Sequence, residues 1–410
     1  MTVVEFFDNV PIENILSALI CIRPTRVIMV GQDLDKMKKS IGRFERILTA
    51  RSLKVEMIPC LVFKNNLTNI VDRLSRIVET YNDCVFDLTG GEDLYLTGIG
   101  VLIERLGNRI QCHRFNLNND TLTDCDADGN VCATGSFNVS AEENIIINGG
   151  VIVKESTFAW SGGKELETDV ENAFAICRQD PRAWNDRMGM IGALCEMFGD
   201  GGTELSVSFD KKYAMANLKR KGVDFAGLES TLKTLEERGL VTELYADDSV
   251  LTFRFKNGQI RKILTVSGQA LELFVATRLK ALKDENGNAL YHDVRVGVVV
   301  DWDEDSKDRY RTVNEIDVLA MRGAVPVFIS CKNGDFDAEE LYKLFSVAER
   351  FGSKYAKKAI VISAFDAIRD ELRARHLEER MNDMGIYPIK NVDKMSADEL
   401  DRKLRALHKL

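Results

Sequence analysis

The sequence contains no run of about 18 uncharged apolar residues, which is the length that a membrane-spanning helix needs. Its first residues, MTVVEFFDNVP, include acidic side chains where a secretory signal peptide has a basic region. Basic residues are not in excess, since the 410-residue chain has 55 Lys and Arg against 64 Asp and Glu, a net charge of −9. We therefore expect neither a membrane span nor secretion. A phosphate-bearing partner must bind to local donors, because the overall field repels it.

Several common catalytic signatures are also missing. The four histidines (His113, His292, His376 and His408) are not spaced with one another or with cysteines as zinc ligands are. The chain has no P-loop, no GxGxxG and no Ser-His-Asp set. Its nine cysteines are odd in number, scattered and mostly set in apolar stretches such as MIPCLVF. They are typical of reduced, buried thiols in a cytoplasmic protein.

What the first 150 residues do contain is an alternation of apolar strands and amphipathic helices. Strands are predicted over 26–31, 55–63 and 84–88, and each is followed by a helix, over 34–51, 67–81 and 93–106. This order predicts a parallel sheet covered on both faces. In such sheets ligands bind beyond the carboxyl ends of the strands.

Glycines and polar residues follow two of these strands. Paired glycines let a backbone pass close to a ligand, and the first amides of a helix are donors for an anion. On its own, Thr-Gly-Gly after a strand is more often a tight turn. Taken together, the two strand ends predict an anion site built from Gly31, Gln32, Asp33, Thr89, Gly90, Gly91 and Asp93.

Residues 151–260 have a different pattern. Helices are predicted over 165–178, 183–198, 211–221 and 224–238, followed by two short strands over 240–245 and 250–255. This order is that of a winged helix, but it is common, and a plain helical connector fits it as well. Both interpretations stay open at this point.

Residues 261–410 return to mixed structure, with a helix over 267–283, strands over 294–300, 313–320, 325–332 and 359–364, and a helix over 337–351. Because side chains alternate along a strand, Glu315 and Asp317 share one face, and so do Ser330 and Lys332. A hairpin of these two strands would bring Asp317 beside Lys332. The carboxylate of Glu272 rides on an apolar helix stripe and should face the sheet.

This combination of residues suits phosphodiester cleavage. Carboxylates are the ligands that Mg²⁺ and Mn²⁺ prefer, and a lysine can hold the attacking water or the developing phosphorane charge. The alternative is a half-buried salt bridge between Glu272 and Lys332, with Glu315 and Asp317 on a solvated edge. The joint order of the residues along the chain favours catalysis.

The segments NEIDVL and VFISCKNG resemble the core of the PD-(D/E)xK restriction-endonuclease-like superfamily. The resemblance implies that Glu272 and Asp317 bind the metal together with the carbonyl of Cys331, and that Lys332 is the catalytic lysine. Ser330 stands where that superfamily usually has Glu or Asp. Either Glu315 supplies the missing oxygen, or the site holds one metal loosely.

The segment DLTGG between strand and helix resembles the CARF domain, a Rossmann-like sensor of cyclic oligoadenylates. A CARF domain followed by a nuclease domain is similar to the type III CRISPR ancillary nucleases that cyclic tetra-adenylate activates. The implied fold is α/β, with a CARF domain over 1–150, a helical or winged-helix-like middle region over 151–260 and a restriction-endonuclease-like domain over 261–410. The implied assembly is a homodimer with the ligand on its two-fold axis.

The implied activity is Mn²⁺- or Mg²⁺-dependent cleavage of DNA, or of single-stranded RNA, in antiviral defence. Two other functions remain. One is a ligand-responsive transcription regulator that uses the winged-helix-like region and has a degenerate nuclease fold, which the serine at position 330 favours. The other is an unregulated repair-type nuclease whose N-terminal domain only dimerises.

Overall fold

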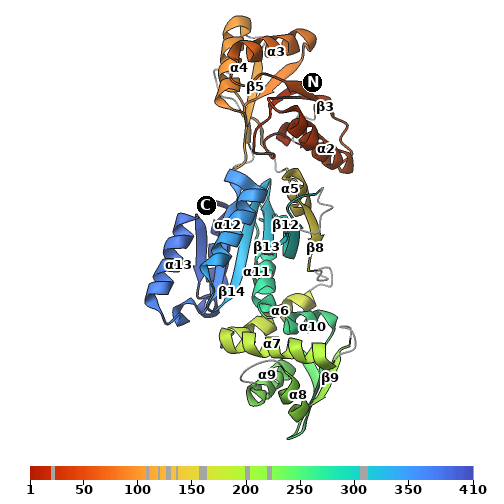
Figure 1. Ribbon diagram of the computed structural model, residues 1–410, viewed down its shortest axis with the longest axis vertical. Helices are drawn as coiled ribbons and strands as arrows, with labels where there is room; N and C mark the ends of the chain where they lie inside the picture. Colours follow the sequence, from red (N-terminus) through yellow and green to blue (C-terminus); the bar gives the residue numbers. More distant parts are fainter. Residues whose placement is uncertain are drawn as a thin grey trace.

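The computed structural model describes residues 1–19, 24–107, 110–118, 121–125, 131–134, 137–156, 164–198, 204–218, 224–304 and 313–409. Figure 1 shows three α/β units along the long axis of the molecule. The C-terminal unit lies in the centre, with the N-terminal unit at one end and the unit of residues 164–265 at the other. In the described part of the chain, no helix has both the length and the apolar character needed to cross a bilayer.

The N-terminal unit is a seven-stranded sheet of order β3-β2-β1-β4-β5-β6-β7, in which the first five strands run parallel. Helix α2 packs with one apolar cluster and helices α3 and α4 with another. The strands are β1 (Thr2–Phe6), β2 (Arg26–Gly31), β3 (Glu56–Leu61), β4 (Cys84–Asp87), β5 (Gln111–Asn116), β6 (Thr121–Asp124) and β7 (Val131–Thr134). The helices are α1 (Leu16–Leu19), α2 (Leu34–Ala50), α3 (Leu67–Thr80) and α4 (Asp93–Leu106).

Strand β1 was not predicted, although it is the central one of the five parallel strands. All five of its residues are buried, so TVVEF lacks the alternation that marks a half-exposed strand. The chain winds outward from β1 through β2 to β3, and then returns to place β4 on the other side of β1. The strand order therefore reverses between β1 and β4, which is where ligands bind in open α/β sheets.

The unit at the far end has a three-stranded antiparallel sheet of order β10-β11-β9. Strand β9 was not predicted from the sequence. The helix predicted over 211–221 corresponds to α8, which ends at Asn217, and residues 219–223 lie outside the described part. One helix, a short strand, two helices and a hairpin follow one another here, which is the order that the winged-helix-like interpretation requires. The elements are α6 (Lys164–Cys177), α7 (Pro181–Phe198), β9 (Ser206–Asp210), α8 (Lys211–Asn217), α9 (Phe225–Glu237), β10 (Val241–Ala246), β11 (Val250–Phe255) and α10 (Gly258–Thr265).

The central unit is a six-stranded mixed sheet of order β16-β15-β14-β13-β12-β8. Its edge strand β8 comes from the region predicted as a connector. This strand joins the central sheet, because Val151 and Ile152 pair with β12. The strands are β8 (Val151–Lys154), β12 (Asp293–Asp301), β13 (Val313–Arg322), β14 (Val325–Asn333), β15 (Lys357–Ser363) and β16 (Ile386–Lys390). The helices are α5 (Ala141–Ile147), α11 (Gln269–Ala281), α12 (Ala338–Gly352), α13 (Glu371–Asp383) and α14 (Ala397–Ala406), and η3 (Ser353–Tyr355) is a short 3-10 turn.

Helices α11 and α12 cover opposite faces of this sheet. Val318 and Ile329 belong to the apolar cluster that contains α11, whereas Leu319 and Phe328 belong to the cluster that contains α12. The expected alternation fails next to Asp317, because Ile316 lies in the α12 cluster although it is two residues from Val318. The neighbouring strand is irregular at the same level, where Gly297 has a φ of +57°. Asp317 is therefore at a distorted part of the sheet rather than on a regular face.

Candidate active site

Asp317 lies where strands β13 and β14 separate. The ladder between them ends at the pair Val318 and Ile329, so the next residues of β14 face a gap in the pairing. The carboxylate of Asp317 fills part of this gap: its Oδ2 accepts hydrogen bonds from the amide of Cys331 at 2.7 Å and from the hydroxyl of Ser330 at 3.0 Å. Because both donors come from β14, the aspartate is held in one orientation.

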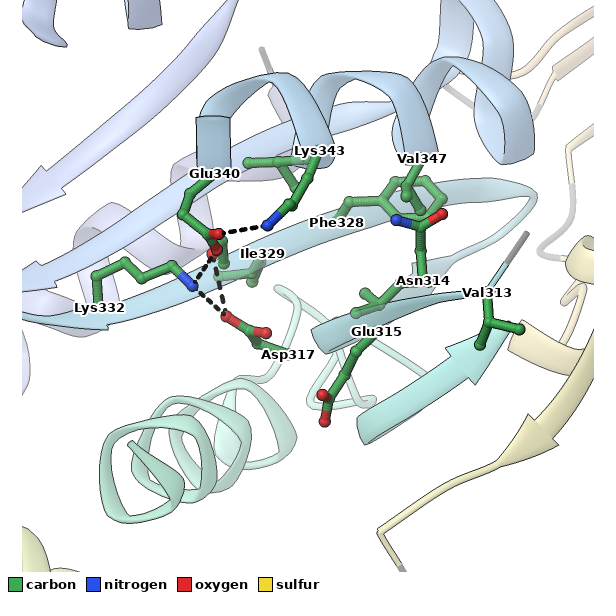
Figure 2. Close-up of a pocket in the computed structure, with 13 residues that line it drawn as sticks. Val313, Asn314, Glu315, Asp317, Phe328, Ile329, Lys332, Glu340, Lys343 and Val347 are labelled. Carbon is green, nitrogen blue, oxygen red and sulfur yellow. Dashed lines mark hydrogen bonds and ion pairs between the residues drawn. The ribbon is translucent and has the colours of Figure 1, made fainter. Parts of the chain in front are cut away.

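Lys332 places its ammonium group beside Asp317. Its Nζ lies 3.8 Å from Asp317 Oδ2 and 2.8 Å from Glu340 Oε2. Figure 2 marks these interactions with dashed lines. The predicted meeting of Asp317 and Lys332 is therefore present in the structure. A pocket of roughly 350 Å³ opens between the separated strands and α12, and Asp317, Ser330, Lys332, Glu340 and Lys343 are among the residues that line it.

Glu272, on α11, is close enough to Asp317 and Glu315 for their charges to act on it, but it is not among the residues that line the pocket. It lies in the first turn of α11, behind Gly268 at a φ of +94°, and its Oε2 accepts a hydrogen bond from the Gln269 side chain at 2.9 Å. Burial and the negative charges of Asp317 and Glu315 raise the pKa of Glu272 to about 8. Such a shift marks a carboxylate with too little positive charge around it.

Glu272, Asp317 and Glu315 carry the oxygen ligands that suit a hard divalent cation, although their carboxylates do not form a close cluster. Among the described residues, no group of three or more His, Cys, Asp and Glu side chains lies close enough to hold a metal ion. The mutual repulsion of Glu272, Asp317 and Glu315 is nevertheless what a divalent cation would relieve, and carboxylate oxygens are the ligands that Mg²⁺ and Mn²⁺ take.

The other predicted residues of this centre have different positions. Glu315 is exposed, and Figure 2 shows its carboxylate pointing away from the Lys332 and Glu340 side chains. Ser330 is buried and orients Asp317. The thiol of Cys331 is buried, which raises its pKa well above the ordinary value, so only the backbone of this residue is available to the site.

Glu340 was not predicted. It lies in the first turn of α12, where its carboxylate accepts hydrogen bonds from Lys332 and from Lys343. Its position in the sequence AEELYKLF, next to the sheet-facing Leu341, was the available signal. The nuclease pattern that the sequence resembles has its acid on β14 and not on the helix that follows it.

The predicted anion site lies at the carboxyl edge of the N-terminal sheet. Thr89 is buried, and its hydroxyl is bonded to the carboxylate of Asp87 and accepts a hydrogen bond from the amide of Phe115 at 2.9 Å. Asp87 also lies 3.3 Å from the ring of His113. The threonine therefore fixes the loop that carries Gly90 and Gly91, rather than facing outward.

The two glycines pack closely against the loop after β1. The amide of Gly91, at a φ of +106°, donates to Asp8 Oδ2 at 3.0 Å. A Cβ at Gly90 would lie 2.7 Å from Asp8 Oδ2 and 3.1 Å from Glu13 Oε2. Asp8 was missed because β1 was missed, and the structure places it at the predicted anion site.

The remaining predicted residues lie on both sides of this loop. Gln32 donates to Glu92 Oε2 at 2.8 Å, which joins the ends of β2 and β4. Gly31 is tightly packed, since a Cβ there would lie 2.9 Å from that of Phe7. Asp33 caps α2 through the amide of Lys36, and Asp93 is exposed at the start of α4.

Glu13 connects this edge to the central unit. Its side chain is completely buried, lies 2.8 Å from the ammonium of Lys354 and accepts a hydrogen bond from the Tyr355 hydroxyl. Both partners belong to η3, which follows α12. The loop below Gly90 is therefore in direct contact with the end of the helix that carries Glu340.

Comparisons with known proteins identify the fold. No family model matches the chain, and no curated protein sequence does. The chain is similar to the crystal structure of protein VC1899 from Vibrio cholerae, with 17% identity, coverage of 100% of this chain and 98% of that one, and a TM-score of 0.75. It is also similar to Can2 from Sulfobacillus thermosulfidooxidans in complex with cyclic tetra-adenylate, with 16% identity, 99% of each chain covered and a TM-score of 0.67.

Both likenesses extend over essentially the whole length of both chains. They confirm the predicted fold class, an α/β protein with a Rossmann-like N-terminal domain and further α/β units. At these identities they establish the fold alone.

Proposed function

We propose that the chain is a cyclic oligoadenylate-activated, metal-dependent nuclease of type III CRISPR antiviral defence. The observation that carries this proposal is the position of Lys332 beside Asp317, in a pocket at the point where two strands separate. The Lys332 ammonium can stabilise the charge that develops in phosphodiester hydrolysis, and the half-buried Asp317 carboxylate can bind the metal that this reaction uses. The proposed domains are residues 1–150 for sensing, 151–260 for transmission or nucleic-acid contact, and 261–410 for cleavage, with α5 and β8 of the first two packing in the central unit.

In the cleavage domain, Glu272, Asp317 and the carbonyl of Cys331 would hold Mn²⁺ or Mg²⁺. When bound, the cation supplies neutralisation of the phosphodiester and a bound water of lowered pKa. Ser330 keeps Asp317 oriented through its hydroxyl, and Lys332 presents the positive charge that stabilises the phosphorane. Glu315, which is exposed, would act by its charge on Glu272 rather than as a ligand.

In the sensor domain, the ligand would bind across the ends of β1, β2 and β4, at Gly31, Gln32, Asp33, Thr89, Gly90, Gly91 and Asp93. Cyclic tetra-adenylate is the proposed ligand because Can2, which shares this fold, is known in complex with it. A four-phosphate ring can contact two protomers at once, so its binding can shift a homodimer between two arrangements. Glu13 would pass this shift to the central unit through Lys354.

The test is a cleavage assay with labelled plasmid DNA and labelled single-stranded RNA, with and without cyclic tetra-adenylate, in the presence of Mn²⁺. The proposal predicts cleavage that requires both the ligand and the metal and that Asp317→Asn and Lys332→Ala abolish. Activity that persists in both variants would refute the site. Activity that ignores the ligand would favour an unregulated nuclease.

A second candidate is a ligand-responsive transcription regulator. The observation that favours it is the hairpin of β10 and β11 with helices α8 and α9, which has the form of a DNA-binding wing, together with Ser330 in place of an acid. Duplex binding without metal, combined with no cleavage under any of the conditions above, would decide for the regulator.

A further inference from the structure

Strand β14, which carries Ser330 and Lys332, has no acidic side chain. Ser330 occupies the position two residues before Lys332, and its hydroxyl donates to Asp317 Oδ2 at 3.0 Å. Ser330 therefore donates a hydrogen bond to the Asp317 carboxylate, whereas an acidic side chain at position 330 would repel that carboxylate. A cation at this site needs another negative oxygen from elsewhere in the fold.

Glu340 is in a position to provide that oxygen. Its Oε2 lies 2.8 Å from Lys332 Nζ, which in turn lies 3.8 Å from Asp317 Oδ2. The two carboxylates thus approach one ammonium from different elements, Asp317 from β13 and Glu340 from α12. Figure 2 shows the three side chains converging at one end of the pocket.

The surroundings of Glu340 differ from those of an ordinary surface ion pair. Its side chain is 31% exposed and lines the pocket, whereas that of Glu339 on the same helix is 76% exposed and does not. Lys343 pairs with both, at 2.9 Å and 3.4 Å respectively. The two glutamates are therefore neighbours on one helix and carry the same charge, but of the two only Glu340 contacts Lys332.

We propose that Glu340 supplies, from helix α12, the carboxylate that strand β14 lacks at position 330, and that it would add to Asp317 as a ligand of the divalent cation. This inference rests on the proposed metal-dependent nuclease function. From the sequence, Glu315 was the residue expected to replace the missing acid. The proposal here assigns that role to Glu340 instead. Glu315 points away from Lys332, and Glu340 points toward it.

The test measures Mn²⁺ binding to the full-length protein without nucleic acid, by isothermal titration calorimetry and by the electron paramagnetic resonance signal of free Mn²⁺. The Glu340→Gln variant should bind Mn²⁺ about tenfold or more weakly than the wild type, as expected for the loss of an inner or supporting ligand. The Glu339→Gln variant is the matched control and should bind as the wild type does.

A carboxylate swap tests the same point by rescue. In the Glu340→Gln background, Ser330→Glu places a carboxylate on β14 and should restore Mn²⁺ binding. Thermal unfolding without Mn²⁺ identifies variants that fail to fold, and Glu340→Asp then serves in place of Glu340→Gln, with an intermediate loss of affinity expected.

Two outcomes separate the inference from the function beneath it. Wild-type Mn²⁺ affinity in folded Glu340→Gln would overturn the role of Glu340 and leave the nuclease proposal standing. Failure of the wild-type protein itself to bind Mn²⁺ would overturn both.

Discussion

The carboxylate of Asp8 accepts a hydrogen bond from the backbone amide of Gly91, with Oδ2 and N 3.0 Å apart. A negative group thus already occupies an amide that the sequence predicts as an anion donor. An anionic ligand that binds here must displace Asp8 or lie against it, and juxtaposed like charges oppose binding. The free protein would in this way be held in a state that rejects weakly bound anions.

The variant Asp8→Asn should therefore bind cyclic tetra-adenylate more tightly than the wild type, by about tenfold, which corresponds to about 1.4 kcal/mol. Isothermal titration calorimetry measures the affinity directly. The matched control is Asp35→Asn, an exposed aspartate at the start of α2. Equal or weaker binding by Asp8→Asn would show that the carboxylate does not compete with the ligand.

The contact between Glu13 and Tyr355 joins the sensor edge to the central unit. Burial raises the pKa of Glu13, while hydrogen bonds from Lys354 and Tyr355 oppose that rise. Removing the hydroxyl in Tyr355→Phe takes away one of the two hydrogen bonds that Glu13 Oε1 accepts and leaves the one from Lys354, a loss that typically costs about 1 kcal/mol. We expect a lower free energy of unfolding and a smaller activation by cyclic tetra-adenylate.

Urea unfolding and ligand-dependent cleavage rates check the two expectations. Tyr342→Phe, which changes an exposed tyrosine on α12, should alter neither. If Tyr355→Phe loses stability but retains full activation, the contact is structural and signalling takes another route.

Glu272 gives the stability of the protein a distinctive pH dependence. Its pKa is raised to about 8 in the fold, against an ordinary value of 4.5. Between these values the folded chain binds more protons than the unfolded chain, so the stabilisation from the protonated carboxyl is present at low pH and is lost as the pH rises toward 8. In the presence of a chelator, the free energy of unfolding should fall over this interval.

The variant Glu272→Gln should flatten this pH dependence, while the matched Glu339→Gln should retain it. Urea unfolding between pH 5.5 and 8.5 measures the slope. Addition of Mn²⁺ should stabilise the wild type most at the high end of this range, where the carboxylate is ionised. A slope unchanged in Glu272→Gln would contradict the environment assigned to this residue.

Ser330 provides a test of how Asp317 is oriented. The variant Ser330→Ala removes one hydrogen bond to Asp317 and leaves the one from the Cys331 amide. We expect about 1 kcal/mol of lost stability and a reduction in cleavage of about tenfold. Thr at this position should retain most activity. A fully active alanine variant would show that the backbone amide alone positions the aspartate.

The sequence predicts most elements with strong amphipathic or apolar patterns, including the strands that carry Asp317 and Lys332. It does not predict β1, because a strand buried on both faces has no alternation, and for this reason it also misses Asp8. It predicts faces correctly where the sheet is regular and fails around Ile316, where the strands are distorted. Glu340 has a sequence signal, its place beside the sheet-facing Leu341, but its proximity to Lys332 depends on how α12 packs on the sheet.

The central claim is that Asp317 and Lys332 form a cleavage site that ligand binding at the N-terminal unit controls. The most direct measurement is the initial rate of plasmid cleavage at fixed Mn²⁺ as the concentration of cyclic tetra-adenylate is raised, for the wild type and Asp317→Asn. We predict a saturating increase for the wild type and a rate at least about a hundredfold lower for Asp317→Asn at every concentration. Equal rates for the two proteins, or a wild-type rate independent of the ligand, would contradict it.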